Sequence, residues 1–177
     1  MTGAGGAVTV RPARPDEQAT IANLFQLYAH DFSEFEETGS MRLEIGADGL
    51  FDPHPSLGRF WTEPRHEALI LQVGASLAGF ALIDDHSHGG ATVDFDMAEF
   101  FVARKFRRAG HASRAVRAIL EARPGRWEIA IARQNTPALN FWPRAIAMIP
   151  AARHLTTTPG DGDRWRGPIL HFEVARN

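Results

Sequence analysis

Residues 99–112 read Glu-Phe-Phe-Val-Ala-Arg-Lys-Phe-Arg-Arg-Ala-Gly-His-Ala. An apolar run that is typical of a strand ends in a basic turn with one glycine, and a segment with helical periodicity follows at once. The free N–H groups at the start of a helix, together with the helix dipole, attract anions. Gly110 lets the backbone approach a bound group closely, and Arg107 and Arg108 add charged hydrogen-bond donors. This stretch therefore predicts a strand, a turn and a helix that together hold a pyrophosphate.

The rest of the chain surrounds this unit with strand and helix patterns. The strand-like runs are residues 8–11, 67–73, 78–83, 94–102, 127–132 and 169–174. Helical spacing predicts a first helix that Asp16 caps, a second that starts at Gly110 and ends before Pro124, and a third over 136–146. Residues 46–66 and 156–162 are rich in turn-forming residues and predict irregular segments. Hairpin strands followed by strand–helix alternation favour an α/β fold with a mixed sheet.

The composition suits one globular domain and excludes several kinds of site. The chain has 177 residues, of which 44% are hydrophobic and 23% charged, and a formal net charge of −2. We expect residues 1–7 to be a flexible lead-in and 8–177 to form a single domain. Without cysteine there are no disulfides, thiolate nucleophiles or cysteine metal ligands. The charge gives no global attraction to nucleic acid or membrane, and no signal peptide or membrane span is visible, so we expect a cytoplasmic protein.

A second motif lies downstream of the basic turn. Residues 135–142 read Asn-Thr-Pro-Ala-Leu-Asn-Phe-Trp, and residues 107–112 fit the pattern Arg/Gln-x-x-Gly-x-Gly/Ala. In this order and at about this separation, the two motifs resemble those of the GCN5-related N-acetyltransferases (GNAT family). The resemblance is detailed over residues 95–147. It implies the GNAT fold, in which helices flank a central mixed sheet and two central parallel strands, here 95–102 and 127–132, splay apart around the pantetheine of acetyl-CoA.

The resemblance also implies roles for individual residues. Acetyl-CoA would be the co-substrate, without a metal, and its contacts would be Phe101, Val102, Arg107, Arg108, Ala109, Gly110, His111, Ala112, Asn135, Phe141 and Trp142. Asn135 would bond the pantetheine amide, and a role as helix N-cap is compatible with that.

Trp142 departs from the family pattern. Many relatives have at this position a tyrosine that protonates the leaving thiolate, and an indole N–H cannot do so at neutral pH. Because a thiolate is a tolerable leaving group, positioning and polarisation by the backbone amides around Phe101 and Val102 can carry much of the rate. Whether another general acid exists stays open.

Glu99 is the candidate catalytic residue. It lies on the strand just before the basic turn, beside apolar residues, and a carboxylate there can accept a proton from an amine, directly or through water. Strand alternation equally permits a side chain that faces solvent. Asp94 and Asp96, on the same strand, are weaker candidates.

Three other clusters of charged residues indicate their function less specifically. The arginines around the turn are compatible with nucleic acid, but the patch lacks interleaved exposed aromatic residues and the chain is acidic overall, so we expect no nucleic-acid partner. Residues 84–88, Asp-Asp-His-Ser-His, predict a polar loop rather than a metal site. The acidic residues Asp31, Glu34, Glu36 and Glu37 are either a solvated face or a wall that attracts a cationic acceptor.

Two functions follow from these observations. The first is an enzyme that transfers acetyl from acetyl-CoA to a primary amine of a small molecule or peptide by direct attack. The alternative is a non-catalytic regulatory or assembly module that binds acetyl-CoA, which the missing tyrosine slightly favours. A homodimer is compatible with both. The acceptor, and whether the acyl group is acetyl or longer, are left open by the sequence.

Overall fold

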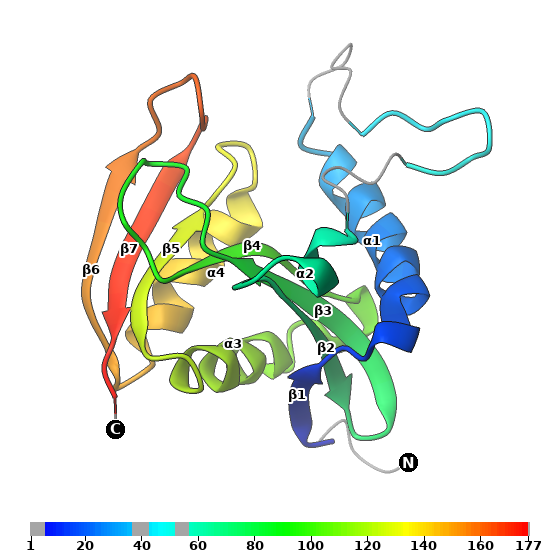
Figure 1. Cartoon of the computed structure of the whole chain (residues 1–177), viewed down its shortest axis with the longest axis horizontal. Helices are drawn as coiled ribbons and strands as arrows, with labels where there is room; N and C mark the ends of the chain where they lie inside the picture. Colours follow the sequence, from blue (N-terminus) through cyan, green and yellow to red (C-terminus); the bar gives the residue numbers. More distant parts are fainter. Residues whose placement is uncertain (1–5, 37–42, 52–56, 177) are drawn as a thin grey trace.

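The computed structural model describes residues 6–36, 43–51 and 57–176. Their strands form one seven-stranded mixed sheet in the order β1-β2-β3-β4-β5-β7-β6 (Figure 1). β4 and β5 run parallel, and the other neighbouring strands run antiparallel. The strands are β1 (Val8–Pro12), β2 (Glu67–Val73), β3 (Ser76–Asp84), β4 (Phe95–Val102), β5 (Gly125–Ala130), β6 (Ala152–Pro159) and β7 (Pro168–Val174). The α/β fold class with a mixed sheet is confirmed.

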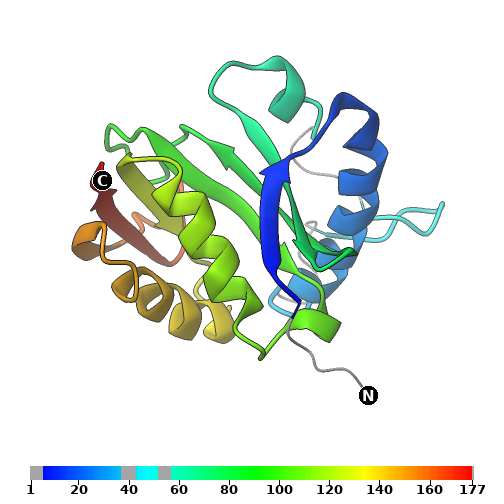
Figure 2. The ribbon, with the colours of Figure 1, turned by 90° about the horizontal axis from the view of Figure 1, so that it is seen from below.

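Helices cover both faces of the sheet, so the molecule has two apolar cores. α3 (His111–Glu121) and α4 (Thr136–Ala147) pack on one face, and α1 (Gln18–Ser33) and the short α2 (Arg59–Thr62) pack on the other (Figure 2). Trp127 and Ile119 are central to the larger core under α3 and α4. Phe25 and Phe80 are central to the smaller one under α1. The apolar face predicted for the first helix is the face that this smaller core buries.

The start of α1 differs from the prediction. Asp16 does not cap the helix, because it lies within a 3-10 turn, Pro15–Glu17, that precedes α1, and its carboxylate pairs with Arg14. Glu17 organises this corner instead, since it accepts the Arg14 backbone N–H at 2.9 Å and forms two hydrogen bonds of 2.7 Å with Arg11. These bonds lower the pKa of Glu17 to about 2.

The C-terminal strands also differ from the prediction. Residues 156–162, predicted to be irregular, contain the end of β6, which pairs with β7 through Pro159. β6 is an edge strand whose residues 153–159 are exposed, so it lacks the apolar alternation by which a strand is recognised, and an edge tolerates proline. β5 lies two residues earlier than the predicted 127–132, because Gly125 and Arg126 already pair with β7.

Candidate active site

The two parallel strands β4 and β5 separate soon after they begin. They pair at Phe95–Trp127 and at Asp96–Glu128, and beyond these pairs each continues only with its antiparallel neighbour. The edges of β4 from residue 97 and of β5 from residue 129 therefore face each other without a backbone ladder. The splayed central strands that the family resemblance implies are present.

The open edge of β4 presents backbone N–H groups to this gap. In an antiparallel ladder, successive residues point their N–H groups to opposite sides. Ala103 donates to Ala78 of β3 at 2.8 Å, so Phe101 also directs its N–H toward β3, and Phe100 and Val102 direct theirs toward β5. Of the two amides expected to polarise a carbonyl, that of Val102 faces the gap and that of Phe101 does not. The backbone N–H of Phe100 also faces the gap, and the sequence analysis did not include it.

The turn between β4 and α3 has the backbone of an anion site. Arg108 and Gly110 adopt left-handed φ angles of 64° and 75°, and Gly110 directly precedes the helix. No side chain of the described residues caps the first turn of α3, so its N–H groups are available to a ligand. A Cβ at Gly110 would meet only the Arg114 side chain, at 3.4 Å, so backbone conformation rather than crowding favours glycine here.

The Arg107 side chain is already bound to other groups of the protein. Its Nε donates to the Val102 carbonyl at 2.6 Å, and its Nη2 pairs with Asp31 of α1. Arg104 pairs with the same carboxylate at 2.8 Å. Burial alone would raise the pKa of Asp31, but the hydrogen bonds from Arg104 and Arg107 outweigh it and hold that pKa below its ordinary value. Arg107 thus ties α1 to the end of β4, and Asp31 belongs to this tie rather than to an open acidic wall.

The rest of the turn is anchored from inside. The buried His111 ring places Nδ1 2.9 Å from the Phe106 carbonyl, and its Nε2 has no partner among the described residues. The Ala109 carbonyl accepts a hydrogen bond from Arg114 at 3.0 Å, and Ala112 packs against the core. These residues therefore shape the turn and contribute backbone groups to it, while their side chains stay with the protein.

Arg108 differs from Arg107 because its side chain stays available. It is exposed, and within residues 6–36, 43–51 and 57–176 no carboxylate forms an ion pair with it. Arg108 therefore supplies positive charge beside the helix start, together with Arg114, whose guanidinium lies next to Gly110.

The second sequence motif lies at the start and middle of α4. Asn135 is the N-cap, since its Oδ1 accepts the Ala138 N–H at 3.0 Å, which leaves its Nδ2 as the group that can donate to a ligand. Phe141 and Trp142 pack on Phe100 of β4, at ring-centroid distances of 6.2 and 5.3 Å. Trp142 is 7% exposed, so it supports the open edge of β4 from the core side.

A β-bulge in β4 sets the direction of Glu99. Leu82 pairs with Glu99 and Asp84 pairs with Asp96, so β4 has two residues where β3 has one. Without the extra residue, positions 96 and 99 would lie on opposite faces of the sheet. The bulge brings both carboxyl groups to the face that α1 covers, because Leu82 belongs to that core. Glu99 is half-buried there.

The two weaker candidates, Asp94 and Asp96, have opposite surroundings. Asp94 pairs with Arg126 at 3.0 Å, and hydrogen bonds from that residue lower the pKa of Asp94 to about 2. Asp96 is 1% exposed, and burial, followed by the charges of Asp84, Glu128 and Glu99, raises its pKa well above the ordinary value. Asp94 is thus held as a carboxylate just before β4 begins, and Asp96 lies near Glu99 on the same face.

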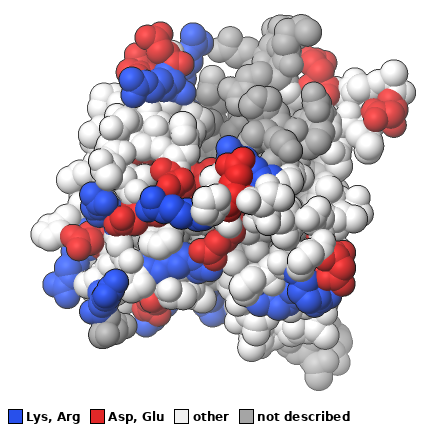
Figure 3. Space-filling model, viewed as in Figure 1, with Lys and Arg blue, Asp and Glu red and all other residues white. Residues whose placement is uncertain are grey.

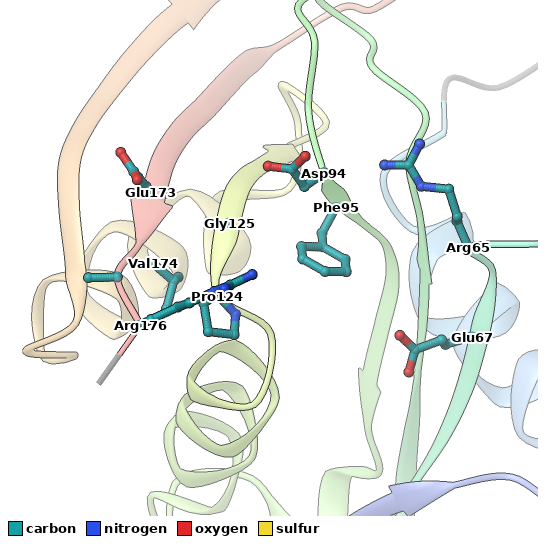
Figure 4. Close-up of a pocket in the computed structure, with 10 residues that line it drawn as sticks. Arg65, Glu67, Asp94, Phe95, Pro124, Gly125, Glu173, Val174 and Arg176 are labelled. Carbon is teal, nitrogen blue, oxygen red and sulfur yellow. The ribbon is translucent and has the colours of Figure 1, made fainter.

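Two hollows lie outside the gap. One, of about 560 Å³, is at the starts of β4 and β5, where Figure 4 shows Asp94, Phe95 and Gly125 with charged side chains around them. Two of its three acidic residues, Glu67 and Asp94, already form ion pairs with arginines, and the third is Glu173. The other, of about 640 Å³, lies between the β6–β7 hairpin and Arg133. Figure 3 shows acidic and basic side chains intermingled on this face of the molecule.

Comparison with known proteins agrees with this geometry. The model of the acetyltransferase (GNAT) family matches residues 21–146. The chain belongs to the GNAT family of acetyltransferases. A search of curated proteins finds no match. The residues described include no group of three His, Asp or Glu that could hold a metal, and none of their helices is long and apolar enough to cross a bilayer.

Solved structures of low sequence identity share the fold of this GNAT protein. An acetyltransferase from Thermus thermophilus has a TM-score of 0.66 at 14% identity, over 94% of this chain and 96% of that one. Spermidine N-acetyltransferase from Vibrio cholerae, in complex with CoA and spermine, has a TM-score of 0.55 at 10% identity, over 94% of each chain. The ribosomal-protein-S18-alanine N-acetyltransferase from Escherichia coli has a TM-score of 0.53 at 10% identity, over 97% of this chain and 96% of that one.

Proposed function

We propose that this GNAT enzyme transfers acetyl from acetyl-CoA to a primary amine of a small molecule or peptide, by direct attack of the amine on the thioester. The observation that carries the proposal is the open edge of β4 together with the turn that follows it. This turn leads, through a left-handed glycine, to the uncapped N-terminus of α3. A thioester on that edge would meet the Val102 N–H, and a pyrophosphate would meet the turn that follows the strand. A single extended co-substrate of this kind fits both features.

Each part of the site then has a role toward acetyl-CoA. The backbone of residues 107–112 binds the pyrophosphate, with charge from Arg108, while Arg107 holds the turn in place. The Asn135 Nδ2 donates to the pantetheine amide. Val102, assisted by Phe100, polarises the thioester carbonyl. The Vibrio cholerae neighbour supports this assignment, because it has the same fold and its structure is a complex with CoA.

We assign proton removal to Glu99. An ammonium group must lose a proton before it can attack, and the bulge places Glu99 on the face of α1 rather than under α3 and α4. In this arrangement the acceptor enters from the α1 side and the acetyl group from the gap between β4 and β5. The named neighbours act on a polyamine and on a protein alanine, so both small-molecule and peptide amines are reasonable acceptors.

Release of CoA distinguishes the enzyme from a non-catalytic module. The protein is incubated with acetyl-CoA and a panel of primary amines, including polyamines and peptides with free N-termini, and free thiol is measured. Acceptor-dependent release with formation of the N-acetyl product supports the proposal. Tight acetyl-CoA binding with no release above the hydrolytic background on any amine would favour the binding module.

Trp142→Phe should retain most of the turnover. The indole packs on Phe100 and is 7% exposed, so we assign it to the wall beneath the thioester and not to proton donation. Trp142→Tyr, which supplies a hydroxyl, should equal or exceed the parent. A loss above about a hundredfold in Trp142→Phe, which corresponds to about 2.7 kcal/mol of barrier, would show that the indole N–H is essential.

Arg108→Gln should weaken acetyl-CoA binding about fivefold, or about 1 kcal/mol, because it removes an exposed cation that no described carboxylate neutralises. The difference should shrink at high salt. Arg117→Gln is the matched control, since Arg117 is an exposed arginine of α3 that pairs with Glu121. Titration calorimetry measures both, and equal affinities of the two variants would contradict the role of Arg108.

A further inference from the structure

A row of buried acids crosses the sheet beside the proposed base. In the strand register Asp84 of β3 lies next to Asp96 of β4, and Asp96 lies next to Glu128 of β5. Their exposed fractions are 1%, 1% and 0%. Glu99 adds its charge to this row, since it is one of the groups that raise the pKa of Asp96. Glu99 lies three positions along β4 from Asp96 and, because of the bulge, on the same face of the sheet.

Two of the three buried acids are satisfied, and the middle one is not. Asp84 accepts hydrogen bonds of 2.9 Å from Arg59 and from a backbone N–H. Glu128 accepts bonds of 2.6 Å from the Ser87 hydroxyl and from a backbone N–H. Asp96 has no hydrogen-bond partner for its Oδ1 among the described residues, and its Oδ2 lies 3.9 Å from Nε2 of His88. A buried carboxyl group without partners is costly, so its retention needs a reason.

The loop after β3 connects this carboxyl group with solvent. The His88 side chain is 23% exposed and lies between Asp96 and His86, with 4.9 Å between the two imidazole centroids. His86 belongs to the same loop and is exposed to solvent. From the interior outward, the groups are thus the buried Asp96 carboxyl group, the His88 ring and the His86 ring.

From this arrangement we propose that His88 and His86 carry protons between Asp96 and solvent, and thereby clear the proton that Glu99 takes from the acceptor amine. The inference rests on the proposed amine acetylation. After attack, Glu99 passes its proton through an intervening water to Asp96, and Asp96 passes its own proton to Nε2 of His88. His88 releases a proton from its other ring nitrogen to His86 or water. One proton leaves, and every group returns to its starting state.

The charges around His88 favour this proton transfer. Burial first, and then the nearby His86, lower the pKa of His88, while Glu128 and Asp84 oppose the shift. A neutral imidazole is therefore present at neutral pH to receive a proton. His171 of β7 lies 3.6 Å from Glu128, and Arg59 of α2 offsets Asp84. The distance of 3.9 Å between Asp96 and His88 exceeds a hydrogen bond by about 1 Å, so transfer requires the His88 ring to move by that amount.

The dependence of turnover on buffer concentration tests this proton transfer in the active enzyme. His88→Gln should turn over about tenfold more slowly in dilute buffer, a smaller loss than the roughly 10²–10⁴-fold of a direct acid–base group. Small buffers and added imidazole should restore it, whereas the parent should be insensitive to both. His86→Gln should show the same pattern more weakly. His154→Asn, an exposed histidine on β6 with a left-handed φ of 57°, is the matched control.

Either of two outcomes would overturn the passage. His88→Gln could match the parent in dilute buffer, or it could be slow without any rescue, which would indicate a purely structural role for the ring that packs on Trp165.

A second measurement needs no acceptor, so it separates this inference from the proposed function. The imidazole resonances of His88 are followed by NMR as pH rises. In the parent they should show two inflections, one from the ring itself and a second from Asp96. Asp96→Asn should remove this second inflection and leave that of the ring. Identical titrations in both proteins would overturn the coupling even if the enzyme acetylates amines. Failure of all amines, with the second inflection intact, would instead count against the acetylation proposal alone.

Discussion

Gly110→Asp is expected to weaken acetyl-CoA binding by at least a hundredfold, or about 2.7 kcal/mol. Gly110 has a φ of 75° directly before α3, where a non-glycine residue is strained. The new carboxylate would also accept the N–H groups of the first helical turn, as aspartate does at an N-cap, and would repel the pyrophosphate from the groups that should bind it. Titration calorimetry with acetyl-CoA measures the loss.

Two controls separate charge from strain. Gly110→Ala adds only a methyl group, for which there is room, at a strained φ angle. It should lower the free energy of unfolding by about 1 kcal/mol and leave acetyl-CoA binding measurable. Gly49→Asp places the same residue at a φ of 80° in a remote loop with no atom within 4 Å of the new Cβ. It should bind acetyl-CoA like the parent. If Gly110→Asp also binds like the parent while folded, the pyrophosphate does not lie at residues 107–112.

Local patterns were sufficient for the centre of this fold. Residues 99–112 predict a strand, a turn and a helix, and β4 does run to Val102 and α3 does begin at His111. The turn depends on neighbouring residues alone, because a left-handed glycine and a helix N-terminus are local features. β6 was missed for the opposite reason, since an exposed edge strand has no burial pattern to reveal it.

The partners in the site depend on contacts between distant segments, and these were beyond reach of the sequence. Arg107 was predicted to bind phosphate, but α1 brings Asp31 to it from 76 positions away. The face of Glu99 depends on a bulge that only the register with β3 reveals. A signal for the buried acids existed, because Glu128 interrupts the apolar strand Trp127–Ile129. Its partners in the loop after β3 could not have been deduced from spacing.

The surroundings of Glu99 now sharpen its test. Glu99→Gln keeps the size and hydrogen bonding of the side chain but removes its basicity, so turnover near neutral pH should fall by roughly 10²–10⁴-fold. The loss should shrink at high pH, where the acceptor is already a free amine. Acetyl-CoA affinity should hardly change, because the pyrophosphate turn lies beyond the end of β4. Glu173→Gln, an exposed glutamate on β7, is the control for the same substitution on a strand.

The pH profile decides between Glu99 and its neighbour. If Glu99→Gln matches the parent at every pH, the base is another group, and Asp96 is the next candidate. Its neighbours Asp84 and Glu128 are engaged in hydrogen bonds, and Arg126 holds Asp94 ionised elsewhere. Asp96→Asn should then show the neutral-pH loss. If both variants are slow, but Glu99→Gln is insensitive to small buffers while Asp96→Asn is rescued by them, Glu99 touches the amine and Asp96 acts after it. This pattern is the one we expect, because Asp96 is 1% exposed and no acceptor can reach it without displacing the residues that cover it.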